Sequence, residues 1–344
     1  MEHVLVTGGL GFIGSHTVVE LLESGYMPVI VDNLSNAEPW VLNQIEQITG
    51  VRPPFCQVDC TDRQALDRVL HDHAPMRAVI HFAAMKAVGE SVAKPLQYYR
   101  NNLLSLLNVL ELMAEHVVDR LVFSSSATVY GSPRQLPVDE SSPVQQATSP
   151  YGETKIVGEQ MIASAVHARP SFRCVALRYF NPIGAHPSGL MGELPQGIPS
   201  NLIPYITQTA RGLHGELAVF GHDYDTPDGT PLRDYFHVMD LARAHVQALQ
   251  YMEQGDDDAR YIPINVGAGS PSSVLEIVRE FEAVNGVRVP YKLSPRRPGD
   301  VPAIWASTQL ARQLLGWQPR YTLRDALAHA WQWECHLSSM PRSR

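Results

Sequence analysis

The chain has 344 residues, of which 44% are hydrophobic and 18% charged, and its formal net charge is −8. This length exceeds what a single hydrophobic core serves, so we expect two lobes. The acidic balance and the lack of a basic run argue against a nucleic acid as partner. No apolar stretch approaches the roughly 18 residues of a membrane span. The first strand-like run starts at Val4, so we expect no secretory leader, and the four cysteines lack a C-x-x-C pair, which favours the cytoplasm.

The N-terminal segment predicts a βαβ unit built on a glycine turn. Residues 4–7 have the pattern of a strand and residues 12–23 that of a helix, and Gly8, Gly11 and Gly14 lie between and within them as Gly-x-x-Gly-x-x-Gly. Such a turn lets backbone N–H groups and the helix N-terminus approach a pyrophosphate. The pattern therefore predicts a dinucleotide site.

An acidic residue indicates which of the two nicotinamide dinucleotides, NAD or NADP, the site binds. Asp32 follows a second predicted strand at residues 29–31, eighteen residues after Gly14. Its carboxylate would accept hydrogen bonds from the adenosine ribose and would repel a 2′-phosphate. Residues 33–36 include no arginine to hold that phosphate. We therefore expect NAD rather than NADP.

Further strands are predicted at helix-length intervals, at residues 55–58, 78–82, 120–124 and 172–180. This alternation predicts an α/β fold with a doubly wound, parallel Rossmann sheet. Ligands of such sheets bind beyond the carboxyl ends of the strands. The residues expected at those ends are Asp59, residues 83–86, residues 124–126 and Asn181.

A tyrosine and a lysine open a long predicted helix after Pro150. Tyr151 and Lys155 are four residues apart and so project from one helix face. Free tyrosine has a pKa near ~10, too high for a base at neutral pH. A cation ~4 Å away at an effective dielectric of ~20 contributes ~4 kcal/mol, about three pKa units, from which burial subtracts. The pair indicates a general base, although an exposed helix start has the same spacing.

Beyond Asn181, proline and glycine become frequent, which predicts a smaller, loop-rich second lobe. Residues 261–266 have the pattern of a strand that returns to the first lobe. We therefore expect one domain at residues 1–181 and 234–266, and a second at 182–233 and 267–338. Arg233, Arg296 and Arg297 are candidates for binding phosphate if they converge in space, and for surface ion pairs if they do not. The acidic run at 256–258 is expected to be a solvated loop, and the scattered histidines predict no metal site.

The predicted helix at residues 101–116 is apolar on most sides, more than a helix lying on a sheet requires. Another surface must cover its outer face. A second copy of the chain, forming a homodimer, and a loop of the same chain are both candidates.

Three motifs together resemble the extended short-chain dehydrogenase/reductase family: residues 7–14 (TGGLGFIG), 124–131 (SSSATVYG) and 151–155 (YGETK). Four others resemble the UDP-glucose 4-epimerases of that family: residues 81–91 (HFAAMKAVGES), 178–189 (RYFNPIGAHPSG), 233–241 (RDYFHVMDL) and 296–300 (RRPGD). The resemblance runs from the N-terminus to about Trp333.

This resemblance implies a reversible epimerisation at C4 of a UDP-hexose, UDP-galactose to UDP-glucose, by transient hydride transfer to tightly bound NAD through a 4-keto sugar. It implies that Tyr151 is the base, that Lys155 is its electrostatic partner and a ribose ligand, and that Ser126 bonds the sugar 4-oxygen. It places further residues at the NAD site: Gly8, Gly11, Phe12, Ile13, Gly14, Asp32, Asn33, Asn36, Asp59, Cys60, Phe82, Ala83, Lys86, Asn101, Tyr151, Lys155, Tyr179 and Pro182. The implied UDP-sugar site consists of Lys86, Ser126, Tyr151, Asn181, Asn201, Leu202, Ala218, Phe220, Arg233, Tyr235, Arg297, Asp300 and Ile304.

The chain departs from the family pattern at three positions. Phe12 replaces a frequent tyrosine and Pro298 a common glutamate, and the effect of Pro298 is open. Ile304 stands where members restricted to unacetylated sugars commonly have tyrosine. Isoleucine is smaller than tyrosine but branched and stiff. Some activity on UDP-GlcNAc and UDP-GalNAc is therefore expected.

Two other functions are compatible with the fold. A nucleotide-sugar 4,6-dehydratase or a UDP-glucuronate decarboxylase belongs to the same superfamily, but a dehydratase needs an acid beside the active-site hydroxyl, and Ala127 and Thr128 follow Ser126. A non-catalytic dinucleotide sensor would predict a damaged base pair, whereas Ser126, Tyr151 and Lys155 are all present.

Overall fold

A parallel seven-stranded sheet forms the centre of the first lobe in the computed structural model, which describes residues 1–255, 260–297 and 299–340. The strand order is β11-β6-β5-β4-β1-β2-β3, so the order reverses beside β1, where an open α/β sheet binds its ligands. The strands are β1 (His3–Thr7), β2 (Met27–Asp32), β3 (Phe55–Gln57), β4 (Met76–His81), β5 (Arg120–Ser126), β6 (Arg173–Tyr179) and β11 (Tyr261–Val266). The predicted doubly wound Rossmann fold is confirmed.

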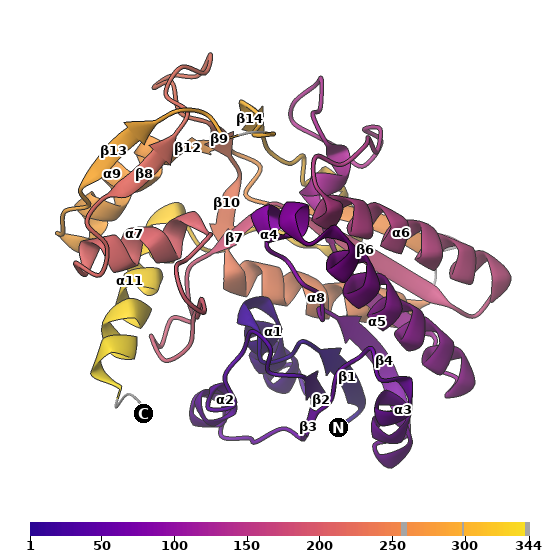
Figure 1. Cartoon of the computed structure of the whole chain (residues 1–344). Helices are drawn as coiled ribbons and strands as arrows, with labels where there is room; N and C mark the ends of the chain where they lie inside the picture. Colours follow the sequence, from indigo (N-terminus) through magenta and orange to yellow (C-terminus); the bar gives the residue numbers. More distant parts are fainter. Residues whose placement is uncertain (256–259, 298, 341–344) are drawn as a thin grey trace.

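Helices cover both faces of this sheet (Figure 1). One face carries α1 (Phe12–Glu23), α2 (Val41–Thr49), α8 (Val238–Gln254) and α10 (Gln309–Leu315), and the other α3 (Arg63–Asp72), α5 (Pro95–Glu115) and α6 (Pro150–Ala168). Alternation along β1 decides which side chain serves which face, because Val4 and Val6 pack in one core cluster and Leu5 in the other. A strand buried on both faces therefore reads as a continuous apolar run.

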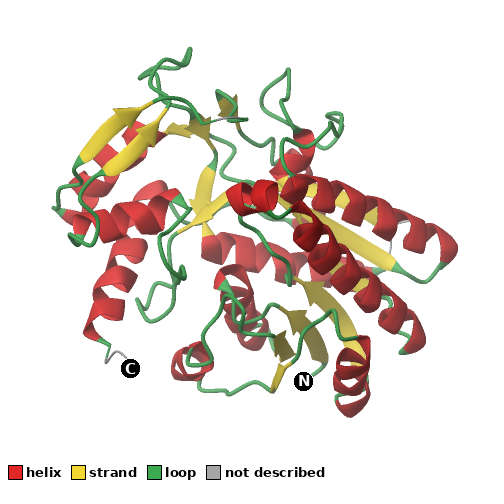
Figure 2. Cartoon of the chain, in the orientation of Figure 1, coloured by secondary structure: helices red, strands yellow, loops and turns green. Residues whose placement is uncertain are grey.

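The second lobe is more regular than its glycine and proline content predicts (Figure 2). Its helices are α7 (Leu202–Ala210), α9 (Val274–Asn285) and α11 (Leu323–Ser339). Capping boxes at Ser273 and Thr322 begin α9 and α11. Its small sheets pair β8 (Leu217–Phe220) with β13 (Tyr291–Ser294), and β9 (Leu232–Arg233) with β12 (Ser272–Ser273) and β14 (Ala303–Ile304).

A third small sheet leads from the first lobe to the second. In it β7 (Asn181–Ile183) pairs in parallel with β10 (Tyr235–His237). β7 directly follows β6, and β10 directly precedes α8. The strand predicted at residues 261–266 is β11, which pairs with β6 at the edge of the large sheet. Two short elements complete the described structure: α4 (Val88–Ala93) and the 3₁₀ turn η1 (Ala127–Tyr130).

The C-terminal part of the chain also contributes to the first lobe. α10 packs against α8 and β11, and the indole of Trp317, fully buried, donates to the Asp240 carbonyl oxygen at 2.8 Å. Residues after 267 thus belong partly to the core of the dinucleotide lobe.

Several predictions concern absences or residues that are not described. The acidic residues 256–258 and Pro298 lie outside the described residues. Within the described ranges, no helix is long and apolar enough to cross a membrane. The same ranges hold no cluster of three or more His, Cys, Asp or Glu side chains that could hold a metal ion.

Candidate active site

The glycine turn between β1 and α1 has the close packing that a pyrophosphate cradle requires. Gly8 has φ +69°, and a Cβ there would lie 2.9 Å from the Ala83 backbone nitrogen; a Cβ at Gly14 would lie 2.2 Å from the Gly8 carbonyl oxygen. Gly11 is the N-cap of α1, which has neither a side-chain cap nor an acid in its first turn. The first N–H groups of α1, including those of Phe12 and Ile13, are therefore not held by a side chain and suit an anion.

Asp32 ends β2 beside this turn. Its two carboxylate oxygens accept hydrogen bonds from the backbone of Leu10 at 3.1 Å and of Leu34 at 2.9 Å. Burial nevertheless raises the pKa of Asp32, and these backbone bonds only partly offset the rise. A carboxylate has about four lone-pair sites, so two remain for ribose hydroxyls.

The loops after β2 and β3 meet at the same edge. Asn33 donates to Asp59 at 2.9 Å, and Asn36 lies three residues further along, exposed. Asp59 also accepts from the Thr61 backbone and hydroxyl at 2.8 and 2.7 Å, and these bonds hold its pKa below the usual value although burial opposes them. Cys60 is buried, and burial raises the pKa of its thiol to about 12, so it is an inert packing group.

The loop after β4 is fixed from two directions. The backbone of Phe82 donates to the Thr7 carbonyl at 3.0 Å, and that of Ala83 to the Thr7 hydroxyl at 3.3 Å. Further along, the buried Asn102 amide exchanges hydrogen bonds with the backbone of Met85 at 2.8 and 3.0 Å. Asn101 donates to the Asn102 side chain at 3.0 Å. The loop is therefore clamped to α5 beside the predicted NAD site.

The predicted catalytic residues come together where β5, β6 and α6 meet. α6 begins at Pro150, and the Ser149 hydroxyl caps it by accepting from Gly152 at 3.2 Å. Ser126 hydrogen-bonds Tyr151. The Lys155 ammonium lies 5.8 Å from the centre of the Tyr151 ring and donates to the Ser124 carbonyl oxygen at 2.6 Å. Tyr179, at the end of β6, also hydrogen-bonds Ser124.

Burial within the protein raises the pKa of Tyr151, whereas the Tyr–Lys spacing alone predicts a lower pKa. Burial raises it to about 12, and the hydrogen bond with Ser126 offsets only part of this. Burial likewise lowers the pKa of Lys155 to about 8, against the opposing charge of Glu159. Desolvation therefore dominates the pKa of both residues, and a further positive charge is needed to make Tyr151 a base.

A buried ion pair supports Lys155 from one turn further along α6. Glu159 accepts from Arg178 at 2.9 and 2.6 Å, from Ser125 at 2.5 Å and from Tyr261 at 3.0 Å. Arg178 also donates to the Tyr130 hydroxyl at 3.0 Å. With its hydrogen bonds satisfied on β5, β6 and β11, Glu159 fixes α6 against the sheet.

The three candidate arginines of the second lobe differ in their partners. Arg233 pairs with Asp300, and the Arg297 guanidinium stacks 4.1 Å from the centre of the Phe220 ring. Both arginines lower the pKa of the buried Tyr235, although burial raises it to about 12 overall. Arg233 and Arg297 are thus within electrostatic reach of one side chain.

Arg296 forms a surface ion pair with Asp223 at 2.8 Å and stacks 4.1 Å from the centre of the Tyr224 ring. Burial raises the pKa of Tyr224, and Arg296 together with Arg233 lowers it. Of the two roles expected for these arginines, Arg296 therefore has that of a surface ion pair.

Strand register sets the other second-lobe candidates. Ile304, buried on β14, lies opposite Arg233, and Asn181 and Pro182 on β7 lie opposite Tyr235 and Phe236 on β10. Ala218 lies on β8, and Leu202 is the first residue of α7.

Lys86 and Asn201 come together on a residue that was not predicted. Both donate to one carboxylate oxygen of Glu193, at 3.2 and 2.6 Å respectively. Glu193, Asn102, Glu159 and Arg178 are the site-supporting residues that the sequence analysis missed. A charged or amide group within an apolar segment was the available signal for Arg178 and Asn102, whereas nothing in the loop sequence singled out Glu193.

These features define a nicotinamide-dinucleotide protein with a tyrosine, lysine and serine at the carboxyl edge of its sheet. Residues 4–267 match the NAD dependent epimerase/dehydratase family. The UDP-glucose 4-epimerase of Pongo abelii is 49% identical over 339 residues, which cover 97% of this chain and 96% of that protein.

Solved structures agree with this match. The UDP-glucose-4-epimerase of Stenotrophomonas maltophila, with bound NAD and formylated UDP-arabinopyranose, is 48% identical with a TM-score of 0.95, over 98% of this chain and 99% of that chain. The Bifidobacterium longum enzyme in complex with NAD⁺ and UDP is 46% identical with a TM-score of 0.93, over 97% and 98%. The chain belongs to the NAD dependent epimerase/dehydratase family and, within it, to the UDP-glucose 4-epimerases.

Proposed function

We propose that this chain interconverts UDP-galactose and UDP-glucose by epimerisation at C4, with NAD retained between turnovers. The observation that carries the proposal is the Ser126–Tyr151 hydrogen bond beside Lys155, at the edge of a sheet whose neighbouring turn suits a pyrophosphate. Relatives that bind NAD with UDP or a UDP-sugar support it.

The glycine turn, Asp32 and the Asn33–Asp59 pair fit NAD. In this proposal the α1 N-terminus takes the pyrophosphate, Asp32 takes the adenosine ribose, and Lys155 takes the second ribose. Bound NAD supplies a reversible hydride acceptor for C4 of the sugar.

Three side chains move the proton. Ser126 holds the sugar 4-oxygen, and Tyr151 removes the 4-hydroxyl proton as C4 loses its hydride, which leaves a 4-keto sugar. Tyr151 returns the proton to that oxygen when hydride reaches the opposite face of C4. Lys155 stabilises the phenolate by its charge.

The second lobe is proposed to supply binding energy rather than chemistry. An enzyme that must present either face of the hexose cannot grip the ring tightly, so its affinity should come from the nucleotide diphosphate. Arg233 and Arg297, near Tyr235 and Asp300, are the cations proposed to hold that diphosphate.

Ile304 is proposed to set the tolerance for N-acetylated sugars. It lies opposite Arg233 in the β9–β14 register, on the same strand pair as the proposed diphosphate ligand. Its side chain lacks the ring and hydroxyl of a tyrosine, so the site keeps more room. We therefore propose partial activity on UDP-GalNAc and UDP-GlcNAc.

The domain division at residues 1–181 with 234–266, and 182–233 with 267–338, is also part of this proposal, except that α10 and Trp317 pack against the first domain. We assign NAD to the first domain and the UDP-sugar to the second. The cytoplasm is the proposed location, and the four cysteines, all free thiols, suit its reducing conditions.

A homodimer through α5 and α6 is also proposed. The two helices pack side by side (Figure 1), yet Leu104 and Leu107 on α5 remain 38% and 42% exposed. A second copy would cover these leucines.

The proposal is tested by incubating the purified chain, without added cofactor, with UDP-galactose and UDP-GalNAc in one tube. Anomeric protons are followed by NMR. We expect UDP-galactose to convert to UDP-glucose on co-purified NAD, and UDP-GalNAc to convert more slowly. No conversion, even after NAD is added, would contradict the proposed activity, while conversion of UDP-galactose alone would contradict the assignment to Ile304.

A further inference from the structure

Glu193 connects the two lobes through one carboxylate oxygen. That oxygen accepts from the Lys86 ammonium at 3.2 Å and from the Asn201 side-chain amide at 2.6 Å. Lys86 belongs to the loop after β4 in the first lobe, and Asn201 is the N-cap of α7 in the second. The Glu193 side chain is only 13% exposed, whereas Lys86 is 50% exposed. The acid is thus the fixed member and the lysine the adjustable one.

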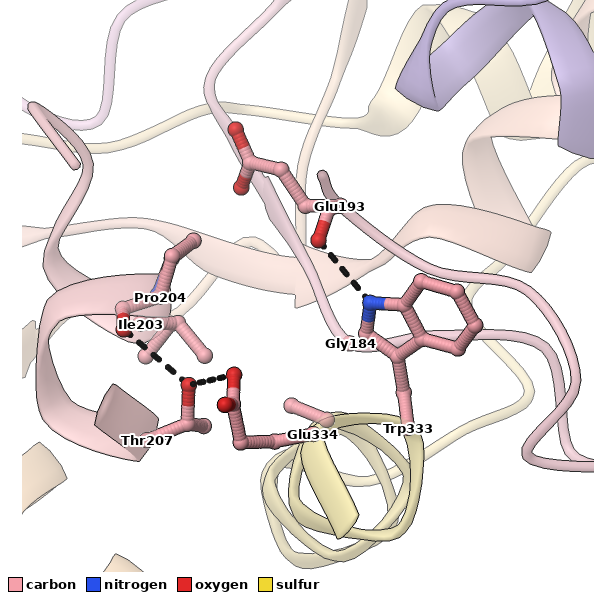
Figure 3. Close-up of a pocket in the computed structure, with 8 residues that line it drawn as sticks. Gly184, Glu193, Ile203, Pro204, Thr207, Trp333 and Glu334 are labelled. Carbon is pink, nitrogen blue, oxygen red and sulfur yellow. Dashed lines mark hydrogen bonds between the residues drawn. The ribbon is translucent and has the colours of Figure 1, made fainter. Parts of the chain in front are cut away.

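The backbone around Glu193 is held in place independently of its carboxylate. The Trp333 indole donates to the Glu193 carbonyl oxygen at 2.9 Å (Figure 3). Trp333 approaches so closely that a Cβ at Gly192 would lie 2.4 Å from its ring. Gly192 also bridges to Ala185 across the hairpin-like loop that follows β7. Figure 3 shows the carboxylate directed away from the small cavity beneath it, whose wall includes Trp333 and Thr207.

Because its backbone is anchored, Glu193 can set the distance between Lys86 and Asn201. The loop that carries Lys86 is clamped at Met85 by Asn102, and Asn201 is the N-cap residue of α7. One oxygen that accepts from both donors sets the distance between them. Lys86 has three N–H donors and uses one here, so it can still bind another acceptor.

We propose that Glu193 is a positioning residue that holds Lys86 and Asn201 at the spacing required by a bound UDP-sugar. The inference rests on the proposed function and on the UDP-sugar site implied by the family resemblance, which includes both donors. Among the described residues, the hydrogen bonds of Glu193 go to Lys86, Asn201 and Trp333 and not to Tyr151 or Ser126. Removal of Glu193 therefore weakens binding and leaves the chemical step intact.

The test compares Glu193→Gln and Glu193→Ala with the unaltered chain in steady-state kinetics on UDP-galactose. Glutamine keeps the acceptor oxygen but removes the charge that attracts Lys86, so we expect KM to rise about 3-fold. Alanine removes both contacts, and we expect about 10-fold. In both variants kcat should stay within about 2-fold, because binding alone is affected. Glu280→Gln is the matched control, since it breaks the Arg324–Glu280 pair at 2.7 Å in the same lobe and should change neither constant.

A double-mutant cycle with Lys86→Met separates positioning from general loss of structure. If Glu193 acts through Lys86, the KM effects of Glu193→Gln and Lys86→Met are not additive. Additive effects, an unchanged KM, or a fall in kcat matching the rise in KM would overturn the inference. If the alanine variant melts at a clearly lower temperature, the isosteric glutamine variant decides. Failure of the unaltered chain to convert any UDP-sugar would instead refute the proposed function.

Discussion

Tyr151 is buried, and two opposing influences act on its pKa. Burial raises the pKa, the hydrogen bond with Ser126 lowers it, and the result is about 12. Lys155 is itself desolvated, with a pKa of about 8. Each pKa unit corresponds to about 1.4 kcal/mol, so a base at neutral pH needs several kcal/mol of additional favourable charge. Oxidised NAD carries a positive ring, which couples the basicity of Tyr151 to bound cofactor.

The assignment of Tyr151 predicts a specific kinetic defect. Tyr151→Phe removes the phenolic oxygen and keeps the ring, so kcat for UDP-galactose should fall by about 1,000-fold or more. The Kd for UDP, measured by calorimetry, should stay within about 2-fold, because the second lobe is proposed to bind the diphosphate. Tyr26→Phe is the control, since the Tyr26 hydroxyl bonds Glu253 at 2.8 Å outside the proposed site. Near-normal turnover in Tyr151→Phe would refute its role as the base.

Helix α6 carries the proposed catalytic residues and belongs to the proposed dimer interface. Ser149 and Pro150 fix where it begins, Tyr151 and Lys155 lie in its first turns, and Glu159 ties it to the sheet through Arg178. Its packing partner is α5. Gly158 on α6 allows this close packing, because a Cβ there would lie 3.0 Å from the Phe123 ring on β5 and 3.2 Å from Leu106 on α5. A dimer formed on α5 and α6 would therefore rest directly on the catalytic helix.

The exposed leucines of α5 make the proposed dimer testable. Light scattering of the unaltered chain should give a mass near twice the 38.1 kDa of one chain. Leu104→Glu with Leu107→Glu should give a single-chain mass, because burying two carboxylates in an apolar interface costs several kcal/mol. A monomer in the unaltered chain would contradict the proposal.

Much of the first lobe was predictable because its elements obey local rules. The apolar runs of β1, β4 and β11, buried on both faces, and the N-terminal turn of α6 were readable from residue periodicity, glycine spacing and Pro150. The second lobe was predicted only as loop-rich, without individual helices or strands. Its strands are two to four residues long, too short to show a period.

The site's supporting residues depend on contacts between segments far apart in sequence. Glu193 meets Lys86 across 107 positions, and Arg178 meets Glu159 only because α6 crosses β6. The electrostatics of Tyr151 likewise depend on burial, which spacing alone does not reveal. Sequence motifs therefore indicated the candidate reacting groups, while tertiary packing determines their charge and position.

At the scale of the whole molecule, the proposed function divides binding from chemistry between the two lobes. In it the Rossmann lobe binds NAD and carries the proton-transfer residues, and the second lobe provides the arginines for the diphosphate. This division allows a keto sugar to turn over between hydride loss and return while its nucleotide stays held. The hydrogen removed from C4 is then carried by NAD and returned to C4 without exchange with solvent.

Isotope retention tests this central claim most directly. UDP-galactose carrying deuterium at C4 is converted in ordinary water, and the UDP-glucose formed is analysed by mass spectrometry and NMR. The account predicts that nearly all product keeps deuterium at C4, because the atom removed from one face is returned to the other. Loss of the label to solvent would contradict hydride transfer to retained NAD and would indicate proton exchange at C4 instead.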